Sequence, residues 1–273
     1  MIGLTQERRL VVHTLASGSS GNCTLVSDGE VHILIDAGIS CRRIVNSLAE
    51  LGISAQDLRG IFVTHEHTDH ICGLQTLTKR FSLPIFTAAP CAEMIAAKAP
   101  ATMHVLRTIE PEEEICLDSL AVQGFETSHD SAASMGFTVA GERGKMALAT
   151  DLGMLTSCVR EAVAGVDLLI AETNHDRNML RYGPYPYYLK QRVSGSTGHL
   201  CNEDGAELCR HAAFHGVKTV ILAHLSAENN TPDCAYQAVA ETFAVNGVED
   251  VTIAVAPRDC LSRAFSVGVP VRR

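Results

Sequence analysis

The chain lacks the features that mark membrane, secreted and multi-domain proteins. None of its apolar runs approaches the ~20 residues that a helix needs to cross a bilayer, so we expect no membrane span. Residues 1–9 have neither the apolar core nor the cleavage site of a secretory signal. No Pro/Gly/Ser-rich linker separates the predicted strands and helices, so we expect residues 1–273 to form one domain.

Paired cysteines are also missing. The chain has ten cysteines, but they are scattered, and none belongs to a Cys-x-x-Cys pair. The spacing therefore argues against a disulfide framework and against a separate structural zinc site. Reduced thiols indicate a cytoplasmic protein. Hydrophobic residues make up 46% of the chain, enough for a large core.

The most informative segment reads THEHTDH at residues 64–70 and directly follows an apolar run. In an extended segment, residues two apart point the same way, so His65 and His67 can bind one ion from one side. Asp69 and His70 can then turn toward a second ion. Imidazole and carboxylate groups are the usual ligands of Zn(II), Mn(II) and Fe(II). The alternative is a group of hydrogen-bonded or solvent-exposed histidines that bind no metal. That alternative would account for a single histidine, but the spacing of three favours a metal site.

This segment resembles the H-x-H-x-D-H motif of the metallo-β-lactamase superfamily, and the resemblance runs from Leu15 to about Pro257. Upstream, a strand-like segment ends in D-x-G, where the resemblance implies that Asp36 supports the metal loop from behind. Further segments that fit the family follow in order at residues 127–130, 148–151 and 222–224. Each comes after an apolar run that could be a buried strand.

The resemblance implies two divalent ions, Zn(II) or Mn(II). One ion would be held by His65, His67, His129 and Asp151, and the other by Asp69, His70, His224 and the same Asp151, which bridges them. Taken alone, Asp151 could be a turn former or a helix cap, and the two later histidines could lie in loops. Their order and their places after strands favour ligands.

Apolar and alternating runs predict the elements of the fold. Strands are expected near residues 10–16, 22–27, 31–36, 60–64, 84–87, 103–106, 120–126, 135–141, 145–150, 167–172, 218–223 and 251–256. Helices are expected at residues 40–51, 71–81, 91–98, 157–164, 203–215 and 234–245. Asn202 is a plausible cap for the fifth helix, and Thr231 with Pro232 begins the sixth. The pattern predicts the αββα sandwich of the superfamily, an α/β fold with two mixed sheets face to face and helices outside.

Three more segments closely resemble the WalJ/YycJ-type family, a bacterial branch associated with 5′-to-3′ exonuclease activity on DNA. They are LASGSSGNCT at 15–24, AETNHD at 171–176, and GHLCN at 198–202 paired with AHLSAENN at 223–230. The resemblance implies a hydrolase that cleaves phosphodiester bonds. Two divalent ions about 3.5 to 4 Å apart can neutralise a phosphodiester and ionise a bridging water, so the predicted ligands suit this substrate.

The leaving alkoxide needs a proton or a cation, and His199 and His175 are the spare candidates. His199 lies just before a predicted helix, whose N-terminus favours anions, so it could be a general acid, a phosphate binder or a structural histidine. For His175, we prefer a structural role in the loop after its strand. Asp69 is counted as catalytic too, since its loss should abolish cleavage. Residues 17–22 could bind phosphate through backbone N–H groups or form a tight turn.

Residues 177–201 contain no acidic residue, although the chain carries a net charge of −9. They hold four basic residues and four tyrosines, of which we expect Arg177, Arg181, Tyr182, Lys190 and Arg192 to contact a DNA end. An equally good interpretation is a surface loop whose tyrosines pack on the domain or on a second subunit of a homo-oligomer. The overall acidity predicts local, salt-sensitive contact.

Other functions stay open at this point. An RNA-processing nuclease is the hardest to exclude, because nothing visibly reads a 2′-hydroxyl. A cyclic phosphodiesterase or thioesterase would need a closed pocket for a small molecule. A metal-stabilised binding module would be favoured by a missing ligand, but none is missing.

Overall fold

Two β-sheets form the centre of the structure, a computed structural model that describes residues 8–268. In spatial order, the first sheet contains β14 (Phe265–Ser266), β1 (Val11–Ala16), β2 (Cys23–Ser27), β3 (His32–Ile35), β4 (Leu58–Phe62), β5 (Ile85–Thr87) and β6 (Leu106–Thr108). The second contains β13 (Thr252–Val255), β12 (Thr219–Ala223), β11 (Leu168–Glu172), β10 (Lys145–Ala149), β9 (Met135–Ala140), β8 (Leu120–Glu126) and β7 (Glu114–Leu117). The expectation drawn from residues 1–9 falls mostly on residues 1–7, which lie outside the described residues.

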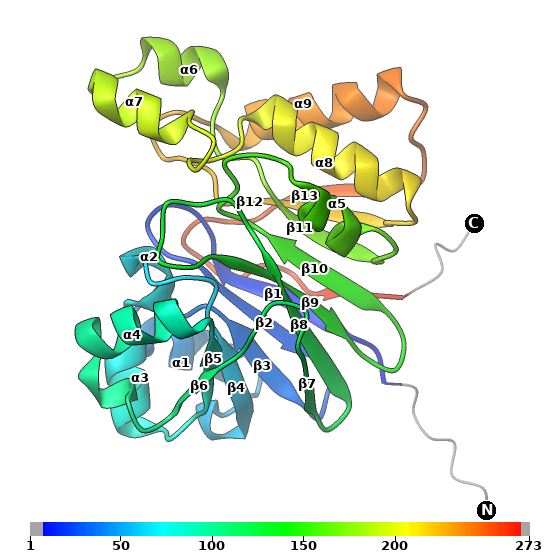
Figure 1. The fold of residues 1–273 in the computed structure, drawn as a ribbon. Coiled ribbons are helices and arrows are strands. Elements are labelled where there is room, and N and C mark those ends of the chain that lie inside the picture. The colour runs from blue at the N-terminus through cyan, green and yellow to red at the C-terminus, as the bar shows by residue number, and fades with distance from the viewer. Residues whose placement is uncertain (1–7, 269–273) are drawn as a thin grey trace, which may run out of the picture.

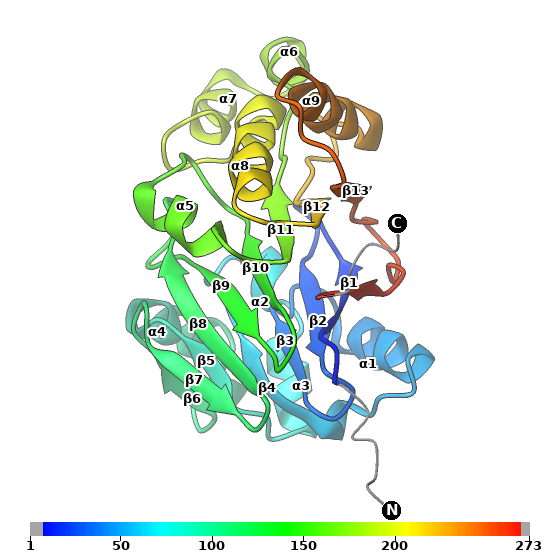
Figure 2. The ribbon, with the colours of Figure 1, turned by 90° about the vertical axis from the view of Figure 1, so that its right-hand side faces the viewer.

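Both sheets are mixed. Strands β3 to β6 run parallel to one another, as do β10 to β13, and the other neighbours are antiparallel. Parallel neighbours need crossover connections, and the helices in those connections cover the outer faces. The predicted αββα sandwich is confirmed (Figures 1 and 2). Within the described part of the chain, no helix combines the length and the apolar character that a membrane crossing requires.

The helices divide between the two faces. The first sheet is covered by α1 (Cys41–Glu50), η1 (Ala55–Asp57), α3 (Leu74–Arg80), α4 (Ala89–Lys98) and η2 (Pro100–Thr102). The second is covered by α5 (Ser157–Val163), α8 (Asn202–Phe214) and α9 (Pro232–Val245). The short α2 (Thr68–Ile71) follows β4, and α6 (Arg177–Tyr182) and α7 (Tyr187–Val193) lie beside α8 and α9, beyond the strand ends (Figure 1).

The central strands of the second sheet are buried on both faces. On β11, Leu168 and Ile170 pack between the sheets, whereas Leu169 packs with the outer helices. A strand covered on both faces must be apolar throughout, which explains its unbroken hydrophobic run. The rings of Phe62 on β4 and Phe137 on β9 meet edge to face at 5.5 Å between centroids. This contact helps to hold the two sheets together.

Helix caps confirm one expectation and correct another. Thr231 caps α9 by accepting a backbone hydrogen bond, and Pro232 takes the first turn, as predicted. The predicted cap of α8 at Asn202 is wrong, because the sulfur of Cys201 accepts the first-turn N–H instead. The buried Asn202 amide exchanges two hydrogen bonds with Asn230, at 2.9 and 2.8 Å. A buried amide needs such partners, so this pairing takes the side chain away from the cap.

Other differences have local causes. The predicted helix at 71–81 is split into α2 and α3 by Gly73, where a Cβ would lie only 2.4 Å from the carbonyl oxygen of Ile39. The predicted strand at 103–106 begins only at Leu106, because η2 and a turn occupy the preceding residues. Strands β7 and β14 have no counterpart among the predicted strands. The first is largely exposed and the second has two residues, so neither gives a clear periodic signal.

Candidate metal centre

Strand ends from both sheets meet at one edge of the sandwich, and the predicted ligands follow them. In the first sheet, residues 65–70 come after β4, and α2 carries Asp69 and His70. In the second sheet, His129 follows β8, Asp151 follows β10 and His224 follows β12. Each of the seven predicted ligands belongs to at least one group whose donor atoms all lie within 4.8 Å of one another. The fold therefore brings the whole predicted set together.

Three buried residues at these strand ends have left-handed backbone conformations. The φ angles are 62° at Asp36, 59° at Asp151 and 56° at His224. Such backbone costs about 1 to 3 kcal/mol per residue and persists where the surrounding structure imposes it. Asp and His tolerate it better than branched residues do. The strained positions of these strands thus coincide with the candidate centre.

The first group of donors consists of His65, His67 and His129. The Nε2 atom of His65 lies 3.0 Å from Nδ1 of His67, which lies 3.3 Å from Nε2 of His129. The Nδ1–H of His129 donates to the carbonyl oxygen of Gly198 at 3.0 Å, which leaves its Nε2 as a lone-pair donor. Three ring nitrogens converging in this way suit a shared cation.

The second group contains Asp69, His70 and His224. One carboxylate oxygen of Asp69 lies 3.4 Å from the Nε2 atoms of both histidines. Behind them, Asp36 accepts hydrogen bonds from Nδ1 of His70 at 2.8 Å and from the backbone N–H of Thr64 at 2.8 Å. Asp36 therefore fixes the 64–70 loop from behind and leaves Nε2 of His70 facing the centre.

Asp151 lies between the two groups and is 1% exposed. Its oxygens lie 3.5 to 3.6 Å from ring nitrogens of three histidines, namely His70, His129 and His224. Among residues 8–268, its Oδ2 atom has no hydrogen-bond partner. A buried carboxylate oxygen without a partner is costly unless a cation compensates it. The donors present therefore fit divalent metal ions.

Burial and charge set the protonation of the centre. Burial, reinforced by the neighbouring His70, holds the pKa of His65 well below its usual value. Burial alone would raise the pKa of Asp151, but the charges of His224 and His70 outweigh it and hold the pKa well below the usual range. Burial opposes protonation of His224, but Asp151 raises its pKa to about 10. Metal ions must displace such protons, so metal affinity should rise with pH.

A buried carboxylate that the sequence analysis did not select, Glu172, positions two histidines. Its Oε1 atom accepts from Nδ1 of His199 at 2.8 Å and from Nδ1 of His224 at 3.1 Å. Its Oε2 atom accepts the backbone N–H groups of Leu152 and Leu200 at 2.8 and 3.1 Å. Burial would raise the pKa of Glu172, but the nearby His199 helps to lower it to about 2. The available signal was a single acidic residue at the end of the apolar β11.

The two spare histidines occupy different places. His199 joins the centre, with its ring centroid 5.1 Å from that of His224 and 5.0 Å from that of His129. His175 belongs to none of the donor groups found among the described residues. It is 3% exposed and lines a neighbouring cleft, where its Nδ1 atom has no hydrogen-bond partner within the described chain.

The turn at residues 17–22 closes on itself and supports α2. The backbone N–H of Gly18 donates to the side chain of Asn22 at 2.9 Å, and that of Gly21 donates to the carbonyl of Gly18 at 2.9 Å. The side-chain amide of Asn22 lies 3.2 Å from Nε2 of His70. These contacts match the tight-turn interpretation. Gly38 belongs to the same junction, since a Cβ there would lie only 1.6 Å from the backbone oxygen of Asp69.

The basic and tyrosine-rich segment forms α6 and α7, not the loop considered as one interpretation. Tyr182, Tyr187 and Tyr188 are 76%, 75% and 72% exposed, so most of each residue lies at the surface. Arg177 pairs with acidic residues of α8, and Arg192 pairs with Asp130. The exposed parts of these tyrosines lie beside the candidate centre, together with the basic side chains of Arg181 and Lys190.

The candidate ligands follow strand ends in the order that the resemblance to the superfamily implied. A model described as the Beta-lactamase superfamily domain matches residues 32–225. The chain belongs to the metallo-β-lactamase superfamily.

Two curated relatives within this superfamily are similar over most of their length. Exodeoxyribonuclease YycJ of Bacillus anthracis is 32% identical over 236 residues, which cover 85% of this chain and 89% of the relative. Exodeoxyribonuclease WalJ of Streptococcus pneumoniae is 31% identical, covering 84% of this chain and 87% of the relative. The WalJ/YycJ-type resemblance is therefore confirmed.

Solved structures share the fold at lower sequence identity. The metallo-β-lactamase fold protein YhfI from Bacillus subtilis superposes with a TM-score of 0.72 at 15% identity, covering 95% of this chain and all of that chain. Zn(2+)-bound PqqB from Methylobacterium extorquens gives a TM-score of 0.69 at 16% identity, covering 93% and 99%. At these identities the likeness describes the fold.

Proposed function

We propose that the protein is a metal-dependent phosphodiesterase that removes nucleotides from the 5′ ends of DNA. The observation that carries the proposal is the buried Asp151, whose unpartnered oxygen lies among histidine donors from both sheets. The relatives named exodeoxyribonuclease, at 31 to 32% identity, support the choice of DNA. The two sheets supply ligands jointly, so we propose that the chain acts as a single catalytic domain.

The proposed centre holds two divalent ions. We assign His65, His67, His129 and Asp151 to one ion, and Asp69, His70, His224 and Asp151 to the other. The many imidazole donors suit Zn(II), and the three carboxylate-containing groups also suit Mn(II). The zinc-bound neighbour PqqB is consistent with the first choice.

Bound divalent ions would neutralise the phosphodiester oxygens and lower the pKa of the attacking water. The chain's own residues supply the remaining steps. Asp69 orients the second group through its contacts with His70 and His224. The hydrogen bond to Glu172 holds the Nδ1 proton of His199, so Nε2 can accept the proton of the attacking water and pass it to the leaving alkoxide. We assign His175 a role in binding in place of catalysis.

We place the DNA end against α6 and α7. Arg192 lines the cleft of about 350 Å³ above the candidate ligands, and Arg177, Arg181 and Lys190 line the next cleft along the same helices. The exposed Tyr182 can stack on an unpaired base. The same exposed tyrosines would suit contact with a second copy of the chain, so a homo-oligomer stays a prediction.

A reducing location fits the proposed function. All ten cysteines lie within the described residues, and all are free thiols. Free thiols persist in the cytoplasm, where chromosomal DNA is also found in bacteria such as those of the named relatives. We therefore propose a cytoplasmic enzyme.

The test is a product analysis with metal-loaded protein. Purified protein with Mn(II) or Zn(II) should degrade end-labelled DNA from the 5′ end, and His67→Ala and Asp69→Ala should abolish cleavage. His104→Ala is the matched control, because His104 is exposed and far from the centre in sequence. Substrates are single- and double-stranded DNA with 5′-phosphate or 5′-hydroxyl ends, and matched RNA.

Two outcomes would contradict the proposal. Full metal loading without cleavage of any DNA or RNA would overturn the nuclease assignment. Cleavage of RNA alone would replace the DNA exonuclease by an RNA-processing nuclease of the same fold.

A further inference from the structure

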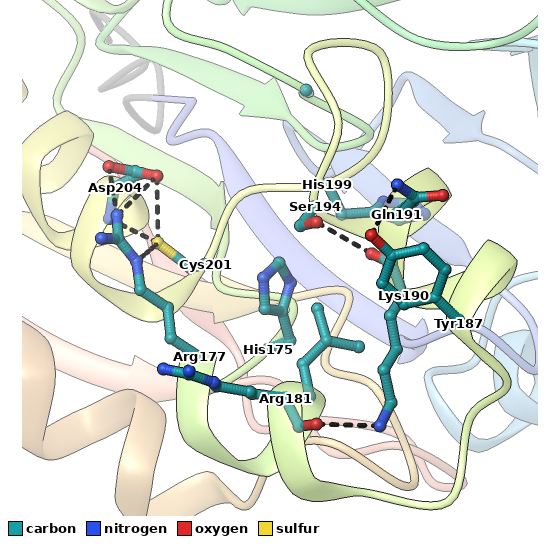
Figure 3. A pocket seen from close by; sticks show the side chains of 12 residues that line it. His175, Arg177, Arg181, Tyr187, Lys190, Gln191, Ser194, His199, Cys201 and Asp204 are labelled. Carbon is teal, nitrogen blue, oxygen red and sulfur yellow. Dashed lines mark hydrogen bonds and ion pairs between the residues drawn. The ribbon is translucent and has the colours of Figure 1, made fainter.

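A larger cleft lies beside the metal centre, and His199 borders both. This second cleft has a volume of about 640 Å³ and lies between α6, α7 and the start of α8 (Figure 3). The cleft over the candidate ligands is lined by His67, Asp69, Asp151 and His224, and again by His199. A strand whose phosphodiester reaches the ligands can therefore extend past His199 into the larger cleft.

The wall of this cleft contains a buried histidine nitrogen, Nδ1 of His175, without a hydrogen-bond partner among the described residues. His175 is 3% exposed, and its ring points into the cleft (Figure 3). Its Nδ1 atom is buried and has no hydrogen-bond partner among residues 8–268. Buried polar side-chain atoms in folded proteins are nearly always hydrogen-bonded. Burial lowers the pKa of His175 to about 4, so the ring is neutral near pH 7 and offers one donor and one acceptor.

Two basic side chains that line the cleft have no acidic partner among the described residues. Within the described chain, neither Arg181 nor Lys190 is paired with a carboxylate, and Nζ of Lys190 donates to the backbone oxygen of Arg181 at 2.8 Å. That bond holds the ammonium at the backbone of α6, whereas the side chain of Arg181 runs from there toward Arg177, away from the ammonium (Figure 3). Arg177 differs, since Glu203 and Asp204 already neutralise it. A guanidinium without a carboxylate partner, such as that of Arg181, suits an anion such as a phosphate monoester in a chain of net charge −9.

The middle of the cleft suits a nucleoside. Leu180 is buried and gives an apolar surface, and the exposed ring of Tyr187 forms the facing wall. Gln191 donates to the hydroxyl oxygen of Tyr187 at 3.1 Å and keeps that side chain in place. An apolar floor, an aromatic wall and a few polar groups are typical of sites that hold a base and a sugar. The volume, near the middle of the range for ligand pockets, is much larger than a lone phosphate needs.

We propose that this cleft holds the terminal nucleotide of the DNA strand, with its 5′-phosphate against Arg181 and its nucleoside against His175 and Tyr187. This inference rests on the proposed nuclease function. In the reaction, water supplies its oxygen to the phosphorus that joins the first two nucleotides, and the bond from that phosphorus to O3′ of the terminal nucleotide breaks. Nε2 of His199 accepts the proton of that water and passes it to O3′, so the ring ends as it began.

This placement accounts for the products. The leaving group is the nucleotide in the cleft, so O3′ lies on the side of the centre that His199 occupies. One nucleotide leaves in each cleavage. The shortened strand keeps the attacked phosphate as its new 5′ end, so it presents the same group to the cleft in the next round.

The first test measures end preference. Metal-loaded protein should cleave 5′-phosphorylated duplex DNA with a higher kcat/KM than the matched 5′-hydroxyl duplex. Arg181→Met should lower this ratio at least tenfold, because a charge-assisted phosphate contact of about 1.4 kcal/mol or more corresponds to that factor. Arg42→Met, at an exposed arginine on α1, is the matched control and should keep the ratio. A duplex with a 3′-phosphate and a 5′-hydroxyl should be cleaved with the same kcat/KM as the duplex that has hydroxyl groups at both ends.

The second test measures binding without cleavage. Thymidine 5′-monophosphate should bind the metal-loaded protein more tightly than thymidine or thymidine 3′-monophosphate, by calorimetry. Arg181→Met and His175→Leu should each weaken binding of the 5′-monophosphate about tenfold, from the loss of one hydrogen bond to a phosphate or base. Arg181 is exposed, so its variant should fold even if the His175 variant does not.

The outcomes separate the two proposals. If the loaded protein degrades DNA from the 5′ end but Arg181→Met leaves both the end preference and the 5′-monophosphate affinity as in the wild type, the cleft assignment is wrong and the nuclease stands. If no nucleic acid is cleaved, the proposed function fails, and the inference that rests on it falls too.

Discussion

The metal centre and the α6–α7 pair are neighbours built in opposite ways. In the centre, the rings of His65, His70 and His224 and the carboxylate of Asp151 are at most 1% exposed. On α6 and α7, the tyrosines are about three-quarters exposed, and α7 has no buried residue at all. Most of the candidate ligands are thus fixed by burial, whereas most of the groups proposed to contact DNA lie at the surface.

The difference follows from what each region has to do. A group that stabilises charge in a reaction must already be in position, because reorienting it at that moment costs free energy. A surface along which a strand moves one nucleotide at a time needs contacts that release easily. Fixed hydrogen bonds such as those of Asp36 and Glu172 serve the first need, and exposed long side chains serve the second.

The largest effect should come from the bridge between the two groups. Asp151→Asn keeps the size of the side chain but removes the charge that the surrounding histidines face. We expect nuclease activity to fall below detection and metal content to drop, measured by end-labelled DNA cleavage and elemental analysis. Asp233→Asn, on the exposed first turn of α9, is the control. A variant that keeps both metal ions and activity would show that Asp151 is not a shared ligand.

The next effect concerns positioning. Glu172→Gln removes the charged acceptor of two histidines, and loss of such a partner typically costs about 10- to 100-fold in metal affinity or activity. The fall should appear in kcat more than in KM, because Glu172 does not line either cleft. Glu241→Gln, exposed on α9, should have no effect. Equal activity of both variants would make Glu172 purely structural.

In the metal-free protein, the stabilising effect of Glu172 should depend on pH. Its pKa in the folded chain is about 2, below its usual 4.5, so its charge stabilises the fold above pH 4.5. That contribution, on the order of a few kcal/mol, is lost as the pH falls from 4.5 toward 2. The difference in free energy of unfolding between wild type and Glu172→Gln, measured in urea, should shrink over this range. A constant difference would contradict the lowered pKa.

Smaller effects should come from the exposed helices. Tyr187→Ala should weaken single-stranded DNA binding about tenfold, since stacking on one base is worth about 1 to 3 kcal/mol. Tyr236→Ala, on α9 and also partly exposed, is the control. Fluorescence anisotropy measures both. Unchanged affinity in Tyr187→Ala would favour the alternative in which these tyrosines contact a second copy of the chain.

The smallest change should be in salt dependence. Arg192 lines the cleft over the candidate ligands but is already paired with Asp130, so its phosphate contact competes with that ion pair. Arg192→Met should reduce the slope of log affinity against log salt by about 1, the value for one phosphate contact. Arg107→Met, exposed on β6, should leave the slope unchanged. An unchanged slope in Arg192→Met would place Arg192 outside the DNA path.

The sequence patterns of the two regions also explain which parts of the structure could be predicted from the sequence. The αββα sandwich and most strands follow from long apolar runs, because strands covered on both faces leave a strong signal. The donor set follows from histidines and aspartates placed directly after those runs. The helices α6 and α7 were missed because Pro184 and Pro186 interrupt the pattern and neither helix has a continuous apolar face.

The sequence alone determined the residue types of the centre, their order and their places at strand ends, because side-chain chemistry and strand periodicity are local properties. Tertiary structure alone decided that Glu172 joins His199 to His224, that Asn202 pairs with Asn230, and that His175 faces a cleft. These contacts join residues up to 52 positions apart through the pairing of strands and the packing of loops. No local pattern specifies such contacts, since they depend on which strand ends the two sheets bring to the same edge.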